Sequence, residues 1–251
     1  SIPPVVSQRI AKADRVFREI VADDEARMET EMMSNPALVT LVDGPGLREQ
    51  LTATEWSRLT ELLTPLGLPE VAMDRMRPWL LSILIALPMC ELLAVQEGGI
   101  TLDRRVEMLA NASGVPVGGL ETAEEALAAF LDLSEEDELQ FLKASITYAG
   151  RSEDLFRTTR DFYLAEDIQK VWEFPFVYYD DALSDGQLKA MQETILNRLL
   201  RDRNLAWMRT LVPALARGNA VVAVGALHLT GEIGLLRLLE DEGFTVRRLA
   251  L

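Results

Sequence analysis

Apolar residues recur every three or four positions over much of the chain, with charged residues between them, a pattern that predicts amphipathic helices. The clearest stretches start at a Ser or Thr suited to an N-cap or stop at a Gly or Pro. Helices are predicted over residues 54–63, 102–112, 134–148, 188–201 and 205–216. We therefore expect most of the chain to be helical.

Strand signals are shorter and lie far apart: residues 15–22, 115–120, 220–229 and 244–251. The third is almost continuously apolar, which is typical of a central strand covered on both faces. A helix over residues 233–241 leads from it into the last strand, a strand-helix-strand order typical of α/β proteins. The pattern favours one helix-rich α/β domain over residues 1–251, with a helical insertion of roughly residues 50–215.

Composition narrows the classes of partner. The 251 residues are 49% hydrophobic and 26% charged, as in folded globular proteins. Forty acidic and 25 basic residues give a net charge of −15, which repels phosphate backbones and argues against nucleic acid as a partner. The longest apolar run, residues 79–90, is shorter than the roughly 20 residues of a spanning helix, so we expect a buried helix and no membrane span.

The single histidine, His228, lies at the carboxyl end of the most apolar predicted strand and precedes a Thr-Gly-Glu turn. Ligands of open α/β sheets bind beyond the carboxyl ends of strands, so this position makes His228 a candidate for catalysis or metal binding. A core imidazole bonded to the backbone is the alternative. Gly225, three residues earlier, allows a backbone or a ligand to approach closely, or serves packing alone.

Two carboxylates occupy similar places. Glu19 lies near the end of the first predicted strand, and Glu121 follows the second. If these strands are parallel neighbours, both converge with His228, and a mixed histidine and carboxylate set is what a divalent metal or a general acid/base pair requires. Glu121 has an alternative role as an acidic first turn stabilised by a helix dipole. Arg203, between two helices, is either an anion or oxyanion clamp or a surface residue.

Several stretches resemble the TraB/GumN family, which is related to the Tiki metalloproteases. The C-terminal residues 222–249 carry its closing Gly-x-x-His motif followed by a Gly, a helix and a last strand. Its other motifs resemble Ala-Asp-Arg-Val-Phe-Arg-Glu at 13–19, Arg-Pro-Trp at 77–79, Leu-Glu-Thr at 120–122 and Asp-Arg-Asn at 202–204. The resemblance covers essentially the whole chain.

The resemblance implies an erythromycin-esterase/Tiki-like core with a mixed sheet, and a metal-dependent hydrolytic site built from two Gly-x-x-His motifs, a Glu and an Arg. Carried over, His228 with Gly225 is the second motif, Glu19 is a ligand or general base, and Arg203 stabilises the oxyanion, with Glu121 in support. A Mn, Co or Zn ion would activate water against a peptide or small acyl substrate.

The chain departs from this pattern because the first Gly-x-x-His should lie just before Ser1 and no second histidine follows. We therefore expect an incomplete site that binds metal weakly or not at all. A non-catalytic protein that binds a ligand or partner on the same fold is the second interpretation, and a structural domain with a core His228 is the third. An absent strand would leave an unpaired sheet edge, which favours homodimerisation or strand exchange.

The resemblance also bears on location. The family is usually exported across the bacterial inner membrane, and the sequence begins at Ser1 without a methionine, as in a mature or trimmed product. Together these lead us to expect a periplasmic or cell-envelope location.

Overall fold

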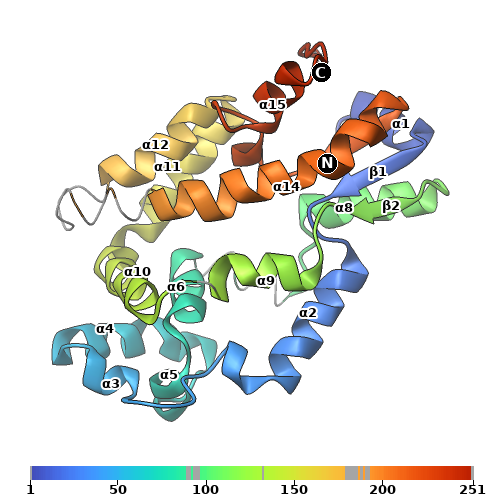
Figure 1. Ribbon diagram of the computed structural model, residues 1–251. Helices are drawn as coiled ribbons and strands as arrows, with labels where there is room; N and C mark the ends of the chain where they lie inside the picture. The colour runs from blue at the N-terminus through green and yellow to red at the C-terminus, as the bar shows by residue number, and fades with distance from the viewer. Residues whose placement is uncertain are drawn as a thin grey trace. The chain divides into compact units, whose positions relative to one another are not determined.

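A computed structural model describes residues 2–88, 97–131, 133–178 and 193–249, together with residues 92, 186 and 189. These residues form many helices and a sheet of three short strands (Figure 1). The chain divides into two compact units. The sheet unit contains residues 1–28, 98–127 and 193–251, and the helical unit contains residues 29–97 and 128–192.

Short 3-10 helices, labelled η, connect several of the α-helices, and η4 is a π-helix. In chain order the elements are α1 (Pro4–Lys12), β1 (Arg15–Arg18), α2 (Ala22–Ser34), η1 (Pro36–Leu38), α3 (Leu47–Gln50), α4 (Ala53–Leu63), η2 (Thr64–Leu66), α5 (Glu70–Arg75), α6 (Pro78–Ala86), α8 (Leu102–Ala112), β2 (Val117–Gly119), α9 (Ala123–Leu131), α10 (Glu135–Tyr148), η3 (Ala149–Arg151), α11 (Ser152–Leu164), α12 (Ile168–Tyr178), η4 (Ile195–Arg201), α14 (Asp202–Ala216), β3 (Ala220–Ala223), η5 (Ala226–His228) and α15 (Leu235–Asp241). The helix-rich α/β class is confirmed. Of the predicted helix over residues 188–201, residues 188 and 190–192 lie outside the described part of the chain.

The three strands form a parallel sheet in the order β2-β1-β3. Val16 in the middle strand pairs with Val117 of β2 on one side and with Val221 of β3 on the other. The mixed sheet that the resemblance implied is therefore not found among the described strands. Helices lie between successive strands and return the chain to the same end of the sheet, which makes the strands parallel.

The central strand is not the one that the apolar pattern predicts. Of residues 220–229, only β3 is a strand, and it lies at an edge of the described sheet with half-buried residues. The strand is short because the chain turns at Gly225, whose carbonyl accepts a hydrogen bond from the His228 N–H at 2.9 Å. The middle strand is β1, which ends in a buried Arg18 paired with Glu107.

The returning strand predicted over residues 244–251 is also not formed. Residues 244–249 have no regular structure, and residues 250 and 251 lie outside the described part of the chain. The preceding helix is present as α15. Phe244 and Val246 are half-buried, as alternation requires, but no described strand lies beside them to complete a ladder.

The sheet unit has a hydrophobic core on each face of β1, because successive strand residues point to opposite faces. On one face Val16 packs with residues of α1 and α8, including Ile10 and Ala110. On the other face Phe17 packs with residues of α14 and α15, including Trp207. The second core supports the helix that carries Arg203.

The helical unit has its own core. Its α4 starts with a capping box, in which Thr52 and Glu55 each bond the other's backbone N–H. The apolar run from Trp79 forms α6 and is buried at Trp79, Leu81 and Ile85, as predicted, while residues 89 and 90 lie outside the described part. None of the described helices is both long enough and apolar enough to span a membrane.

Candidate functional site

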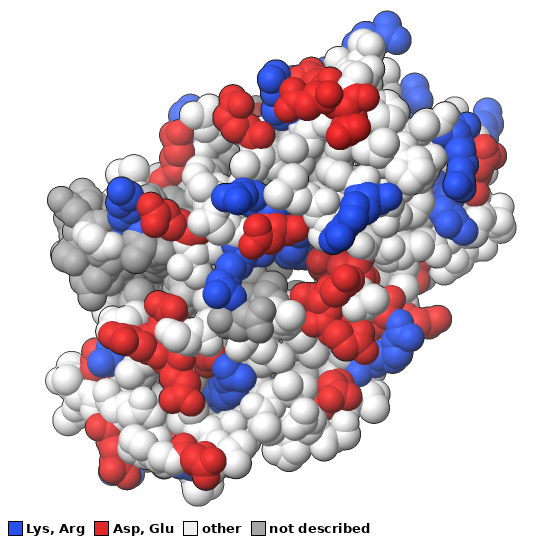
Figure 2. Space-filling view, in the orientation of Figure 1, with Lys and Arg blue, Asp and Glu red and all other residues white. Residues whose placement is uncertain are grey.

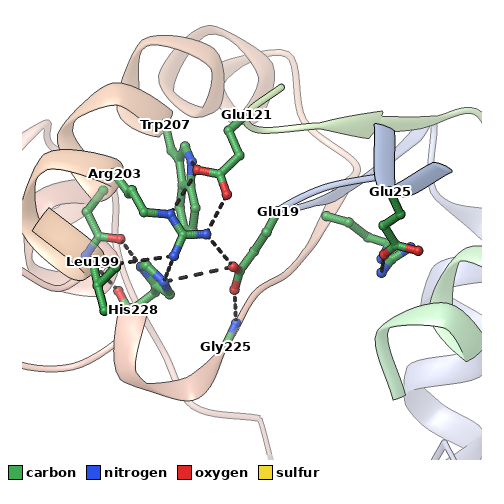
Figure 3. Close-up of polar contacts among 10 residues, drawn as sticks. Glu19, Glu25, Glu121, Leu199, Arg203, Trp207, Gly225 and His228 are labelled. Atoms are coloured by element: carbon green, nitrogen blue, oxygen red, sulfur yellow. Dashed lines mark hydrogen bonds and ion pairs between the residues drawn. The ribbon is translucent and has the colours of Figure 1, made fainter. Parts of the chain in front are cut away.

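The candidate side chains meet at the carboxyl end of the sheet (Figure 3). Glu19 directly follows β1, Glu121 follows β2 by two residues, and His228 lies in the 3-10 turn η5 after β3. β2 and β3 each pair with β1 in parallel. The predicted convergence of the three side chains depended on this arrangement. Arg203 reaches this rim from the first turn of α14 and connects the three side chains.

The Arg203 guanidinium lies at the centre of the cluster. Its Nη2 donates to Glu19 Oε2 at 2.8 Å and to Glu121 Oε1 at 2.5 Å, and its Nε donates to Glu121 Oε2 at 2.9 Å. Its Nη1 donates to the Leu199 carbonyl and faces His228 Nε2, both at 3.3 Å. These contacts account for all five N–H donors of an arginine.

Arg203 keeps its positive charge in this cluster. Burial acts to lower its pKa, but hydrogen bonds and charges from Glu121 and then Glu19 outweigh burial and raise the pKa above its ordinary value. The guanidinium therefore acts as a fixed cation between two carboxylates. The preceding element, η4, is a π-helix, a conformation found frequently at functional sites.

The tautomer of His228 follows from its neighbour Asn204, which is fully buried. The Asn204 Nδ2 donates to two carbonyls, those of Ile233 at 2.7 Å and of His228 at 3.2 Å, so its Oδ1 is an acceptor. His228 Nδ1 lies 2.7 Å from that Oδ1 and must carry the ring proton. The other nitrogen, Nε2, consequently presents a lone pair to the cluster.

The imidazole is neutral at pH 7. Burial lowers the pKa of His228 to about 4; the Glu19 carboxylate opposes this effect, and the Arg203 charge adds to it. The Trp207 ring lies 4.4 Å from the imidazole ring and 4.9 Å from the guanidinium carbon of Arg203, so it closes one side of the cluster.

The two carboxylates have different surroundings. Glu121 is buried, and its Oε2 also accepts a hydrogen bond from Trp207 Nε1 at 3.1 Å. The first turn of α9 is capped by Thr122 and Glu125 instead, each bonded to the backbone N–H of the other. The structure therefore places Glu121 in the cluster and gives the capping role to its neighbours.

Glu19 is the more open carboxylate, with 26% of its side chain exposed. Its Oε1 accepts a hydrogen bond from the Gly225 N–H at 2.6 Å. A Cβ at Gly225 would lie 3.2 Å from that oxygen and 3.7 Å from His228 Cδ2. The close approach anticipated at Gly225 is thus made by the carboxylate, at the turn after β3.

A sequence profile of the TraB/PrgY/gumN family matches residues 1–248. The chain belongs to the TraB/PrgY/gumN family. It is 25% identical over 239 residues to the uncharacterized protein YbaP of Escherichia coli strain K12, and equally to YbaP of Shigella flexneri. These alignments cover 95% of this chain and 81% of each relative. No solved structure matches the chain.

The metal that the family resemblance implies needs a suitable set of donors. His228 Nε2 and Glu19 Oε2 are 4.0 Å apart, and the Arg203 guanidinium contacts both. Within the described residues, no group of three or more His, Cys, Asp or Glu side chains is arranged to hold a metal ion. A catalytic zinc normally has three protein ligands, so these side chains do not by themselves fit a resident metal.

Sequence reasoning gave no role to Asn204 or Trp207, although both belong to the cluster. Asn204 sets the imidazole tautomer, and Trp207 donates a hydrogen bond to Glu121 and packs against the His228 ring at a tilt of 40°. In the structure Arg203 and Trp207 are four residues apart on α14 and so share a face of the helix, but the predicted helix began only at residue 205 and left Arg203 outside it. Nothing in the sequence indicates which of the two imidazole nitrogens Asn204 contacts.

Proposed function

We propose that this TraB/PrgY/gumN protein hydrolyses peptides or other acyl compounds, with Glu19 and His228 as the groups that touch the attacking water. The observation that supports this most directly is the imidazole, which Asn204 holds with its Nε2 lone pair toward a partly exposed carboxylate. The Nε2 atom lies 4.0 Å from Glu19 Oε2 and 3.3 Å from Arg203 Nη1. General acid/base chemistry needs an unprotonated acceptor in reach of the reacting water.

The separation of Nε2 and Glu19 Oε2 suits one water molecule. An oxygen about 2.8 Å from each atom, an ordinary hydrogen-bond distance, fits a gap of 4.0 Å. In the proposed reaction, Glu19 removes a proton from this water as its oxygen attacks the acyl carbon. The tetrahedral intermediate then collapses, and Glu19 returns the proton to the leaving amine or alcohol.

Arg203 can take the role that the family resemblance implies, donation to an oxyanion, only after one of its hydrogen bonds is released. All five of its donors are engaged, so none is free for an oxyanion while Nη1 faces His228. When Nε2 accepts a hydrogen bond from water, the Nη1 hydrogen that faced it is released. That hydrogen then becomes available to the developing oxyanion.

The second candidate function is a binding protein without turnover. It is favoured by the engagement of all five Arg203 donors and by the incomplete set of metal donors among the described residues. In this case the exposed part of the Glu19 carboxylate would contact a ligand that is not chemically changed. A periplasmic or envelope location is part of either proposal.

The deciding experiment measures hydrolysis of a nitrophenyl acetate ester and of a pool of internally quenched peptides, with and without added Mn²⁺, Co²⁺ or Zn²⁺. We expect Glu19→Gln and His228→Gln to lower turnover by about 100-fold or more, the usual range for loss of acid/base catalysis. Glu232→Gln is the matched control, because Glu232 is exposed and lies only four residues from His228.

Metal content by elemental analysis accompanies each assay. Stoichiometric metal that is lost in His228→Gln, together with metal-dependent turnover, would show that an ion completes the site. Absence of turnover under every condition, or turnover unchanged by Glu19→Gln, would overturn the hydrolase proposal. Ligand-induced thermal stabilisation that disappears in Glu19→Gln, without turnover, would favour the binding protein.

A further inference from the structure

Trp207 of α14 joins the hydrophobic core of the sheet unit to the Arg203 cluster. Its side chain is fully buried, and it packs in that core with Phe17 of β1 and with Leu211 of the same helix. Protein interiors are close-packed, so a large ring held in this way has a fixed position. The same ring lies against the cluster, which makes Trp207 a rigid support from which the residues of the cluster can be held.

The polar atom of this ring points toward a carboxylate (Figure 3). Trp207 Nε1 donates a hydrogen bond to Glu121 Oε2 at 3.1 Å, and only 3% of the Glu121 side chain is exposed. Core packing by itself requires no N–H donor, and burial of a donor costs free energy unless it is bonded. The indole N–H therefore acts on Glu121, while the rest of the ring packs in the core.

Glu121 in turn sets the plane of the Arg203 guanidinium. Its Oε2 accepts from Nε at 2.9 Å and its Oε1 accepts from Nη2 at 2.5 Å. Two such bonds between a carboxylate and a guanidinium fix their relative orientation. With this plane fixed, the second hydrogen of Nη2 reaches Glu19 Oε2 at 2.8 Å, and Nη1 faces His228 Nε2 at 3.3 Å. The direction of Arg203 toward both groups thus follows from the position of Glu121.

We propose that Trp207 is a positioning residue, which acts through Glu121 to hold the guanidinium of Arg203 in its orientation. Trp207 is fully buried, so it touches neither the substrate nor the attacking water. Loss of its N–H leaves the Glu121 carboxylate free to rotate about its terminal bond, and the guanidinium plane then turns with the carboxylate. The effect on catalysis rests on the proposed hydrolysis, whereas the orientation of Arg203 is measured without it.

The helical unit offers a matched control in Trp79 of α6. Trp79 is also buried, and its Nε1 also donates a hydrogen bond at 3.1 Å, but the acceptor is the backbone carbonyl of Leu38. Replacement of either tryptophan by Phe keeps an aromatic ring and removes one buried N–H donor. Trp79→Phe should therefore have a similar effect on stability and leave the Arg203 cluster unchanged.

The first measurement is NMR of arginine side chains at physiological salt, which screens the acidic residues spread over the face shown in Figure 2. The Arg203 Nε–H resonance is identified by its loss in Arg203→Lys. We expect Trp207→Phe to speed exchange of this hydrogen with water by about tenfold or more, because its bond to Glu121 opens more often. Trp79→Phe should leave the exchange rate unchanged.

The second measurement is the nitrogen spectrum of His228. The Nε2 resonance should move in Trp207→Phe, because Arg203 Nη1 no longer faces this atom in the same way. The Nδ1–H tautomer should persist, because Asn204 holds it independently of Trp207. A variant that had lost the local fold altogether would lose the tautomer as well, so this pair of signals separates positioning from a general loss of structure.

The third measurement is kinetic and uses the hydrolysis assay. Trp207→Phe should lower kcat by about tenfold or more with little change in KM, because misplaced groups slow the chemical step and substrate does not contact the indole. The double variant Trp207→Phe with Glu121→Gln should be no slower than Glu121→Gln alone, since residues that act through one another are not additive. Trp79→Phe should keep the natural kcat.

Urea unfolding of each variant shows whether it is folded. If Trp207→Phe does not fold, Glu121→Gln tests the same link, because it should move one of the four indole N–H resonances of the natural chain. Unchanged Arg203 and His228 signals in folded Trp207→Phe would overturn the proposal, as would indole signals that Glu121→Gln does not move, or additive kinetic effects. Absence of hydrolysis in the natural sequence, with the NMR results as expected, would overturn the proposed function and leave Trp207 as the residue that orients Arg203.

Discussion

At the scale of single residues, the state of His228 can be measured without ambiguity because it is the only histidine in the chain. We expect NMR of protein labelled in histidine to show the Nδ1–H tautomer at neutral pH, because Asn204 Oδ1 accepts from that nitrogen. The same resonance should titrate with a pKa of about 4, as burial lowers it. An Nε2–H signal, or a pKa near the ordinary value of about 6.5, would contradict this account of the site.

The lowered pKa has a consequence for stability. Between about pH 6.5 and pH 4 the unfolded chain binds a proton at His228 that the folded chain does not, so folding loses free energy as pH falls through this window. A shift of this size corresponds to about 3 kcal/mol. Urea unfolding across the window should show a steeper loss in the natural sequence than in His228→Gln. Parallel curves would count against the shift.

The residues of the site differed in how well the sequence predicted them. Glu19 and His228 lie near the carboxyl ends of predicted strands and Glu121 follows one, so the topology of a parallel sheet was enough to bring them together. The full engagement of Arg203 was beyond prediction, because it depends on the distances from one guanidinium to four partners. In the proposed hydrolysis this detail ties the Arg203 donor for the oxyanion to the state of His228 Nε2.

At the scale of elements, helices were predicted well and strands poorly. The bounds of α8 agree with the sequence prediction, and Ser134 caps α10 as expected, because caps and amphipathic periods are local signals. The strands have only three or four residues, too few for a period, and their pairing partners lie far along the chain. β1 begins at Arg15 as predicted but ends at Arg18 instead of residue 22, and pairing with Glu107 makes Arg18 tolerable in a buried position.

The ion pair between Arg18 and Glu107 leads to a prediction about the loop after β1. Glu107 of α8 pairs with Arg18 and also accepts a hydrogen bond from the Ala22 N–H at 3.2 Å, at the start of α2. Both side chains of the pair are nearly inaccessible, so Glu107→Gln leaves a buried charge poorly compensated. We expect a loss of about 3 kcal/mol in the free energy of unfolding, measured in urea.

Glu25→Gln is the matched control for this change. Glu25 contacts the other terminal nitrogen of Arg18 at 3.0 Å, but 41% of its side chain is exposed. Solvent-exposed pairs contribute little, so its loss should cost less than about 1 kcal/mol. Equal effects of the two substitutions would show that burial of Glu107 is not what matters. Because Glu19 lies in the same loop, Glu107→Gln should also weaken any activity of the site.

At the scale of the whole molecule, the excess of acidic residues predicts how salt affects stability. A net charge of −15 destabilises a folded chain by self-repulsion, and salt screens repulsion between exposed charges. The ion pairs of Arg203 and of Arg18 with Glu107, in the sheet unit, are buried or half-buried and are screened much less. Raising NaCl from low concentration to about 0.5 M, where the Debye length is only a few ångströms, should therefore raise the urea midpoint at neutral pH.

A variant in which exposed acids such as Glu232 and Glu240 become Gln should respond less. A urea midpoint that falls with salt would mean that attraction within exposed ion pairs outweighs the repulsion among acidic residues. The acidic surface would then not destabilise the folded chain.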